Sequence, residues 1–266
     1  KGHVWAQVQL GSHYRGGDGV RRSARQAERW LRAAMEDMSL MDGGPRAAYS
    51  LGCMYAEGDG VRKDLEEAKK LYTMAHEAGY APATGNLGNL FRGLYGPAAG
   101  VPDLEKAAKF YLQSAEAGCA MSQFNLGTRF CSGEGVEKDL TKAKAWFAKA
   151  AKQGNAEAMH NLAVVLFETE GDASTPAQFA LLRAAAEKGQ ADAQVSLPKM
   201  EKHFLSSCAS CGKPSADMAG APLKCARCKA AAYCSAACQK QHWKRGGHKT
   251  ECNGRERYLP GKEEDE

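Results

Sequence analysis

Aromatic side chains and long hydrophobic runs are both scarce in this chain of 266 residues. Phe, Trp and Tyr make up only 8% of the sequence, while the small residues Ala and Gly are abundant. Such a composition favours closely packed helices over a sandwich of sheets, because small side chains let helix axes approach. No stretch of 18 apolar residues occurs, so the sequence predicts no membrane-spanning helix.

Cysteine is almost absent outside one segment. Seven of the ten cysteines lie between Cys208 and Cys252, and the others are Cys53, Cys119 and Cys131. A disulfide-bonded secreted protein spreads its cysteines through the fold, whereas CxxC pairs in one segment indicate metal in a reducing compartment. The three outlying cysteines stand in helical, small-residue contexts and are interpreted as buried thiols.

A unit of about forty residues repeats through the first two hundred residues. A Leu-Gly pair begins the pattern at Leu10 and recurs at intervals of 41, 36 and 39 residues, before it becomes Leu162-Ala163. A glycine turn and then an Asp follow in most copies, and an aromatic residue stands eight residues after the Asp. Apolar residues fall at helical spacing on both sides of the turn, which predicts a helix–turn–helix unit.

Each repeated feature has a mechanical role. Glycine supplies the positive φ angles that stop the first helix and reverse the chain. Asp64 can cap the second helix and form a capping box with Glu67, and Asp103 and Asp139 can act as caps too. A glycine inside a helix, such as Gly52, costs about 1 kcal/mol against alanine. That cost is tolerable where a neighbouring helix needs the space, so we expect the units to stack on one another.

The string A-x-x-L-G-x-x-Y-x-x-G-x-G-V-x-x-D-x-x-K-A resembles a Sel-1-like repeat, a relative of the tetratricopeptide unit. Ala48–Ala68 and Gln123–Ala143 match it closely. The resemblance implies an all-α fold over residues 1–197, a right-handed α-solenoid of about five repeats and a half-repeat, whose concave face holds partner proteins. Ser23 replaces the capping Asp in the first copy, and the fifth copy lacks the Gly-x-Gly-Val turn, so irregular turns are expected in both.

Eight soft metal ligands follow the repeats. Pro198 is expected to end the last helix, and residues 198–207 form a predicted linker. The ligands are spaced C-x2-C, C-x2-C, C-x3-C and H-x3-C, which suits two tetrahedral structural zinc sites. With so few large apolar residues, the segment depends on bound zinc, worth about 10 kcal/mol or more, for its fold. The predicted ligands are Cys208, Cys211, Cys225, Cys228, Cys234, Cys238, His248 and Cys252.

The wider pattern C-x2-C…C-x2-C…Y-C-S-x2-C-Q-x3-W…H-x3-C resembles the MYND zinc finger over residues 208–252. The gap between Cys238 and His248 holds nine residues against the usual seven, which leaves His242 as a rival ligand. The resemblance implies interleaved zinc sites and a shallow groove for proline-rich peptides of the form P-x-L-x-P. One site would use Cys208, Cys211, Cys234 and Cys238, the other Cys225, Cys228, His248 and Cys252, and the groove would be lined by Ser235, Gln239 and Trp243. The alternative for Trp243 is a place in the core of the finger.

About half of the positive charge of the finger is offset by the metal sites. Residues 208–252 carry a formal +6, and seven thiolates with two zinc ions reduce it to about +3. No base-reading side chains stand at regular helical positions, so nucleic-acid binding is the weaker hypothesis. Residues 1–207 are nearly neutral, and the acidic tail at 253–266 is expected to be disordered.

The sequence as a whole therefore predicts a non-catalytic adaptor that binds two zinc ions and protein partners in the cytosol or nucleus. No paired carboxylates, nucleophile–base pair or open metal position is evident. One alternative is a regulatory fragment of a larger MYND-containing enzyme, such as a lysine methyltransferase, whose catalytic domain would precede Lys1. The chain opens at Lys1 in the middle of the repeat pattern, which favours a fragment or processed form. Another alternative is a transcriptional co-regulator that contacts nucleic acid.

Overall fold

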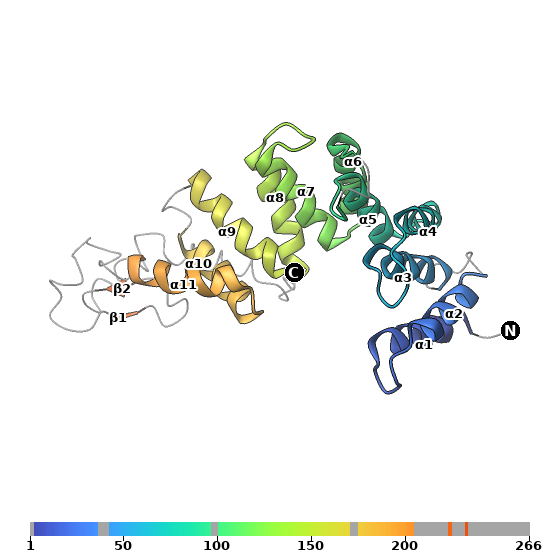
Figure 1. Ribbon diagram of the computed structural model, residues 1–266. Coiled ribbons are helices and arrows are strands. Elements are labelled where there is room, and N and C mark those ends of the chain that lie inside the picture. Colours follow the sequence, from blue (N-terminus) through green and yellow to red (C-terminus); the bar gives the residue numbers. More distant parts are fainter. Residues whose placement is uncertain are drawn as a thin grey trace, which may run out of the picture. The chain divides into compact units, whose positions relative to one another are not determined.

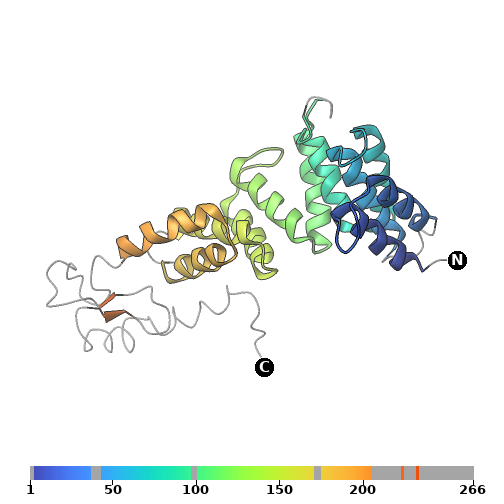
Figure 2. The same cartoon turned by 60° about the horizontal axis from the view of Figure 1, so that its bottom comes forward.

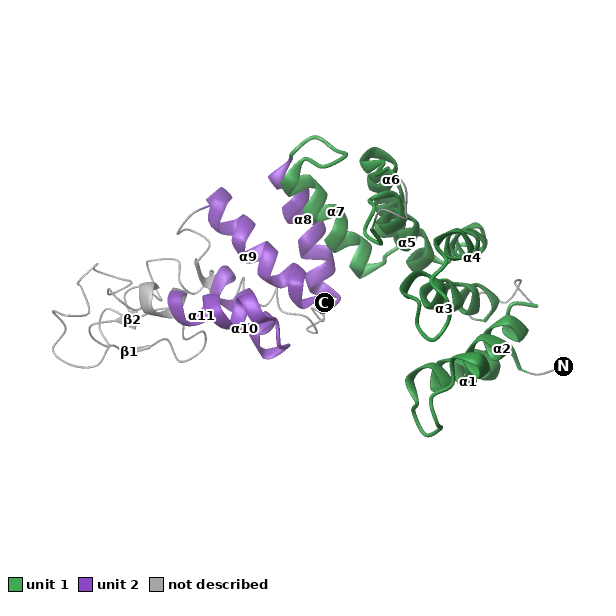
Figure 3. Ribbon diagram, in the orientation of Figure 1, with its two compact units in different colours: residues 1–138 green, residues 139–266 purple. Residues whose placement is uncertain are grey.

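The computed structural model describes four helical ranges and two short strands: residues 3–36, 43–96, 101–170, 175–204, 223–224 and 232–233. They belong to two compact units, residues 1–138 and 139–266, which are coloured separately in Figure 3.

Unit 1 is built from consecutive pairs of antiparallel helices (Figure 1). Within a pair the two helices pack against each other, and the second also packs against the first helix of the next pair. Each pair thus covers an apolar face that its neighbour would otherwise leave exposed, as in other helical-repeat proteins. The helices are α1 (Val4–Gly16), α2 (Ala24–Ala34), α3 (Gly44–Glu57), α4 (Leu65–Glu77), α5 (Ala81–Phe91), α6 (Leu104–Glu116) and α7 (Ala120–Ser132).

Unit 2 contains further helices of the same kind and the two strands (Figures 1 and 2). Each helix packs against the next one along the chain. The strands pair antiparallel, with Leu223 opposite Tyr233. The elements are α8 (Leu140–Lys152), α9 (Ala156–Glu170), α10 (Thr175–Glu187), α11 (Ala191–Phe204), β1 (Leu223–Lys224) and β2 (Ala232–Tyr233).

Aspartate side chains cap the second helices of the repeats, as predicted. The carboxylates of Asp64, Asp103 and Asp139 accept hydrogen bonds from the backbone N–H three residues on, at 3.0, 2.9 and 2.9 Å. The capping box expected at Asp64 is only half formed, because the backbone N–H of Asp64 donates to the carbonyl of Tyr55 at 3.0 Å. That bond ties the start of α4 to the end of α3.

The first turn is regular, contrary to the expectation from Ser23. The hydroxyl of Ser23 accepts from the Gln26 N–H at 3.4 Å and so replaces the missing carboxylate. Gly17 and Gly19 adopt φ angles of 86° and 73°, close to those of the equivalent glycines in the second copy. A hydroxyl is a sufficient N-cap, so the loss of Asp did not disturb the turn. The turn of the fifth copy, at 171–174, lies outside the described residues.

Buried aromatic rings fill the cores of the repeats and pack closely against glycines of the neighbouring helix. Tyr72, Tyr111 and Phe147 are fully buried. A Cβ on Gly52 would lie 2.7 Å from Cε1 of Tyr72, and a Cβ on Gly88 would lie 2.8 Å from Cε1 of Tyr111. Both contacts are too short for a methyl group, which confirms that these glycines make room for the ring of a packed helix.

The last helix does not end at Pro198, so that prediction is wrong. α11 continues through Pro198 to Phe204, and the predicted start of the linker therefore lies inside a helix. A proline removes one backbone hydrogen bond but does not forbid the residues after it from staying helical. The bias that proline places on the preceding residue was overridden here by the rest of the 14-residue helix.

Candidate functional site

The described part of the predicted zinc finger is the ladder between β1 and β2. In the sequence, β1 is followed directly by Cys225 and β2 directly by Cys234. The strands are antiparallel, so the C-terminal ends of β1 and β2 lie at opposite ends of the ladder. The chain therefore leaves toward these two cysteine pairs in opposite directions.

The predicted ligands and groove residues themselves lie outside the described residues. Their donor chemistry still suits a structural zinc site, because seven thiolates and one imidazole are the soft ligands that zinc prefers. The residues concerned are Cys208, Cys211, Cys225, Cys228, Cys234, Cys238, His248 and Cys252 as ligands, His242 as the rival ligand, and Ser235, Gln239 and Trp243 in the groove.

A chain of polar contacts connects the second and third repeats. The sulfur of Cys53 accepts hydrogen bonds from the Tyr72 hydroxyl at 3.4 Å and from the Asn86 amide at 3.5 Å. The amide of Asn89 donates to the Asn86 side-chain oxygen at 3.0 Å, and the Tyr111 hydroxyl donates to the Asn89 oxygen at 2.6 Å. Both buried tyrosine hydroxyls thus find an acceptor on the helix that they pack against.

Cys53 is a structural thiol. Its side chain is buried, as predicted, whereas Cys119 and Cys131 are only half-buried. Burial raises the pKa of the Cys53 thiol, so the thiol stays protonated and is a poor nucleophile. The location of Cys53 in the repeat core argues against a redox or catalytic role.

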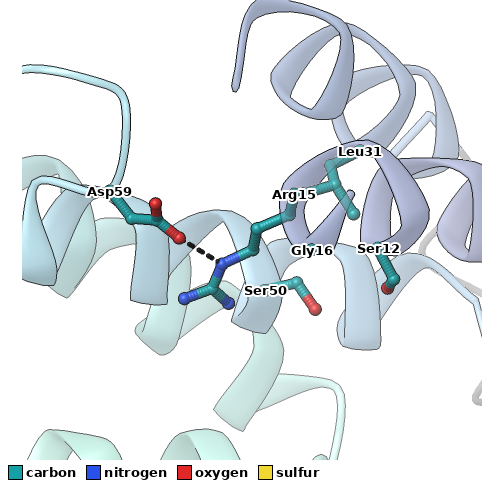
Figure 4. Close-up of a pocket in the computed structure, with 6 residues that line it drawn as sticks. All are labelled: Ser12, Arg15, Gly16, Leu31, Ser50 and Asp59. Atoms are coloured by element: carbon teal, nitrogen blue, oxygen red, sulfur yellow. Dashed lines mark hydrogen bonds and ion pairs between the residues drawn. The ribbon is translucent and has the colours of Figure 1, made fainter. Parts of the chain in front are cut away.

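A pocket of about 340 Å³ lies at the junction of the first and second repeats (Figure 4). Arg15 from α1 reaches across the junction, and its Nε donates to Asp59 at 2.7 Å while its Nη2 donates to Glu57 at 2.8 Å. Arg22 also contacts Asp59. The hydrogen bond from Arg15 holds the pKa of Asp59 below its ordinary value. The charged residues that line the pocket are Arg15 and Asp59, which neutralise each other.

An aromatic stack with lysines over it lies on the third repeat. Phe91 and Phe110 are stacked with ring centroids 5.3 Å apart, and Nζ of Lys106 lies 4.3 Å from the centroid of Phe91. The ring of His76 meets Phe110 edge-on, and its Nδ1 lies 2.8 Å from the Thr84 hydroxyl. His76 is therefore held by packing and a hydrogen bond, which makes it a structural histidine.

The described helices show neither a metal cluster nor a membrane span. Within these ranges, no group of three His, Cys, Asp or Glu side chains is arranged to hold a metal ion. None of the described helices is both long and apolar enough to cross a bilayer.

Two family descriptions match separate parts of the chain. The Sel1 repeat matches residues 6–36, 45–80, 81–119 and 120–155, which together make up more than half of the sequence. The MYND finger matches residues 208–252. Both resemblances expected from the sequence are thus confirmed. The predicted fifth copy, with helices α9 and α10, lies beyond the four matched repeats.

Solved structures with the same kind of repeat are similar to this chain. The antigen c5321 of uropathogenic Escherichia coli, which has an SLR fold, aligns with a TM-score of 0.59 and 30% identity, over 76% of this chain and 42% of that one. A Sel1 repeat protein from Oxalobacter formigenes aligns with a TM-score of 0.64 and 27% identity, over 75% of this chain and 79% of that one. These likenesses confirm the predicted helical-repeat fold.

A curated protein shares a shorter segment. Ubiquitin carboxyl-terminal hydrolase 19 of Arabidopsis thaliana is 49% identical over 47 residues, which are 18% of this chain and 6% of the hydrolase. The chain thus spans a small fraction of that enzyme, so the similarity concerns one module of it.

Proposed function

Because this chain belongs to the Sel1 repeat family and also carries a MYND finger, we propose that it is a non-catalytic adaptor for partner proteins. The observation that carries the proposal is the presence of two separate interaction modules in one chain. Two weak binding surfaces on one chain raise the overall affinity for a partner that contacts both. The described polar groups fit this role, since Cys53, His76 and the Arg15 cluster are engaged in packing or ion pairs.

The finger of the adaptor holds two structural zinc ions in interleaved sites. Support comes from the ladder, whose two C-terminal ends lead to different cysteine pairs in opposite directions. Neighbouring pairs along the chain would then belong to different ions. One ion is bound by Cys208, Cys211, Cys234 and Cys238, and the other by Cys225, Cys228, His248 and Cys252.

Zinc content tests this arrangement. Native mass spectrometry of the full chain should find two zinc ions, and His248→Ala should lower the content toward one. His242→Ala is the matched control and should keep both ions. A loss of zinc in His242→Ala with none in His248→Ala would exchange the two histidines in the assignment.

The finger binds proline-rich peptides of the form P-x-L-x-P in a groove formed by Ser235, Gln239 and Trp243. The indole of Trp243 would supply the flat aromatic surface on which proline rings pack. This part of the proposal is supported by the MYND match alone.

A quantitative pull-down with the full zinc-loaded chain tests the groove. Trp243→Ala should lose the partners that contain proline-rich motifs while its zinc content stays unchanged. Trp5→Ala, which removes a half-exposed tryptophan from α1, is the control and should keep them. Partners that persist in the Trp243→Ala sample would instead be assigned to the repeats.

The proposal includes a cytosolic or nuclear location, because thiolate ligands stay reduced and metal-bound there. Microscopy of the fluorescently tagged chain tests it, and accumulation in the secretory pathway would contradict it.

A further inference from the structure

Arg129 stands where other repeats carry a buried apolar residue. It lies two residues after the glycine of the Leu-Gly pair in α7. The equivalent residues in the second, third and fifth copies are Met54, Leu90 and Val165, which are 0%, 6% and 3% exposed. In the first copy the place is taken by the exposed His13. Arg129 is only 5% exposed, so a charged side chain has been placed in the core position of the repeat.

The charge of Arg129 is incompletely matched. Its side chain forms an ion pair with Glu134 in the turn after α7. The ion pair is made by its Nη1, whereas its Nε is buried and, among the described residues, donates no hydrogen bond. Burial and the nearby positive charge of Arg92 lower the pKa of Arg129. Arg92 caps α5 and hydrogen-bonds the hydroxyl of Tyr111.

At the junction of the first and second repeats, the charges of two neighbouring arginines are matched by carboxylates. Arg15 lies four residues after the glycine of its Leu-Gly pair, as Arg92 does in the third copy. Arg15 pairs with both Glu57 and Asp59, the residues directly before and after the glycine that caps α3. Arg22 also pairs with Asp59, so two arginines meet two carboxylates there; Figure 4 shows the contact between Arg15 and Asp59.

One of those carboxylates is missing at the junction of the third and fourth repeats. The residues before and after the glycine that caps α7 are Ser132 and Glu134. Ser132 therefore stands where the second copy has Glu57, and of these two positions only the second holds a carboxylate, that of Glu134, which pairs with Arg129. Ser132 is exposed and Arg92 is half-buried, so the place of the missing group can be reached from solvent.

We propose that Arg92 and Arg129 form a binding site for a carboxylate group of a partner protein, which supplies the charge that Ser132 lacks. A carboxylate is favoured over a phosphate because the unmatched charge is +1 and the equivalent place in the second repeat is filled by a carboxylate. Arginine is suited to this role, since its fork of N–H donors matches the two oxygens of a carboxylate. The site goes beyond the proposed function, because it contains no residue of the finger and needs no zinc.

Restoring the missing carboxylate within the chain tests the site. The probes are three fluorescein-labelled Gly/Ser hexapeptides: one with a free C-terminal carboxylate, one amidated with a single Glu, and one amidated and neutral. The full chain and Ser132→Gln should bind one or both acidic probes, and Ser132→Glu should bind them at least tenfold more weakly. The neutral probe should not bind. Comparison of the two acidic probes distinguishes a chain terminus from an acidic side chain.

Three results of this titration would overturn the proposal. These are no binding of either acidic probe to the full chain, equal binding by Ser132→Glu and Ser132→Gln, and equal binding of the neutral probe. Because none of these measurements involves the groove at Trp243, failure here leaves the adaptor proposal to its own test.

A second variant separates binding from folding. Arg129→Leu places the residue of the third copy at this position and removes a buried, partly unmatched charge, a change that is often neutral or stabilising. Its thermal midpoint, followed by helical circular dichroism, should stay equal or rise, while acidic-probe binding falls at least tenfold. Arg15→Gln is the control and should lower the midpoint without loss of probe binding. A lower midpoint with unchanged binding for Arg129→Leu would make Arg129 a purely structural residue and overturn the proposal.

Discussion

The repeats and the finger are stabilised by different physical means. In the repeats, small residues and a few buried rings pack helix against helix, with Gly52 and Gly88 leaving room for Tyr72 and Tyr111. Residues 208–252 hold few large apolar side chains but seven cysteines and a histidine at spacings that predict metal ligands. Burial is spread over many positions, whereas metal binding is concentrated in a few. Single substitutions in the repeats should therefore have graded effects, and loss of metal from the finger an all-or-none effect.

Zinc removal should produce the largest effect and confine it to one region. Chelation of the full chain should unfold residues 208–252, which lose about 10 kcal/mol or more of metal binding energy. The helical circular dichroism should remain largely intact, because all the predicted zinc ligands belong to the finger. Limited proteolysis before and after chelation would locate the change. Loss of the whole helical signal would show that the repeats depend on the finger.

Overpacking at a glycine should produce the next largest effect, now in the repeats. Gly52→Leu forces a side chain against the ring of Tyr72, and we expect a loss of about 2–3 kcal/mol in the free energy of unfolding. Chemical denaturation followed by circular dichroism measures it. Lys70→Leu on the exposed side of α4 is the control, with an expected change within about 0.5 kcal/mol. An equal effect of the two variants would contradict the close approach at Gly52.

Removal of a helix cap should cost less. Asp64→Ala deletes the acceptor for the Glu67 N–H, and we expect a loss of about 1 kcal/mol in denaturation experiments. Asp64→Asn keeps an equally good cap and should lie within a few tenths of a kcal/mol of the unsubstituted chain. If both variants lost the same stability, the charge of Asp64 and not its capping bond would be responsible.

The ion cluster at the first junction should give the smallest effect, visible in acid. The hydrogen bond from Arg15 lowers the pKa of Asp59 in the folded chain. The unfolded chain therefore takes up this proton first as pH falls below the ordinary value of about 3.9. The contribution of Asp59 is present above that pH and is lost as pH falls through the lowered folded pKa.

Acid titration of the helical signal tests this sign. Asp59→Asn should reduce the loss of stability between about pH 4 and pH 2, where an ordinary aspartate begins to take up its proton. Asp18→Asn, in the turn of the first repeat, is the control and should behave like the unsubstituted chain. A steeper loss of stability with falling pH in Asp59→Asn would contradict a lowered pKa of Asp59 in the folded chain.

Local patterns predicted the helices and the family of the finger well. Asp64, Asp103 and Asp139 were expected as caps and all three accept the predicted backbone bond. Capping depends on residues only three positions apart, so a linear sequence contains the whole interaction. The same locality explains the confirmed match to the MYND finger, because its pattern is defined by the spacing of Cys and His residues along the chain. The expectations for Pro198 and Ser23 were wrong because each considered one residue by itself. The long helix α11 continues through Pro198, and the hydroxyl of Ser23 caps α2 in place of a carboxylate.

The repeat period, the turns and the order of the helices were therefore encoded in short stretches of sequence. Which charges become buried, and with what partners, was decided by contacts between residues far apart in the chain. Arg129 resembles any surface arginine in the sequence, and Arg92 lies 37 positions before it. Only the packing of α5, α6 and α7 buries Arg129 and brings the charge of Arg92 close enough to act on it, while Glu134 pairs with Arg129. Electrostatic balance depends on distance in space, and for that reason it became visible only when the helices were stacked.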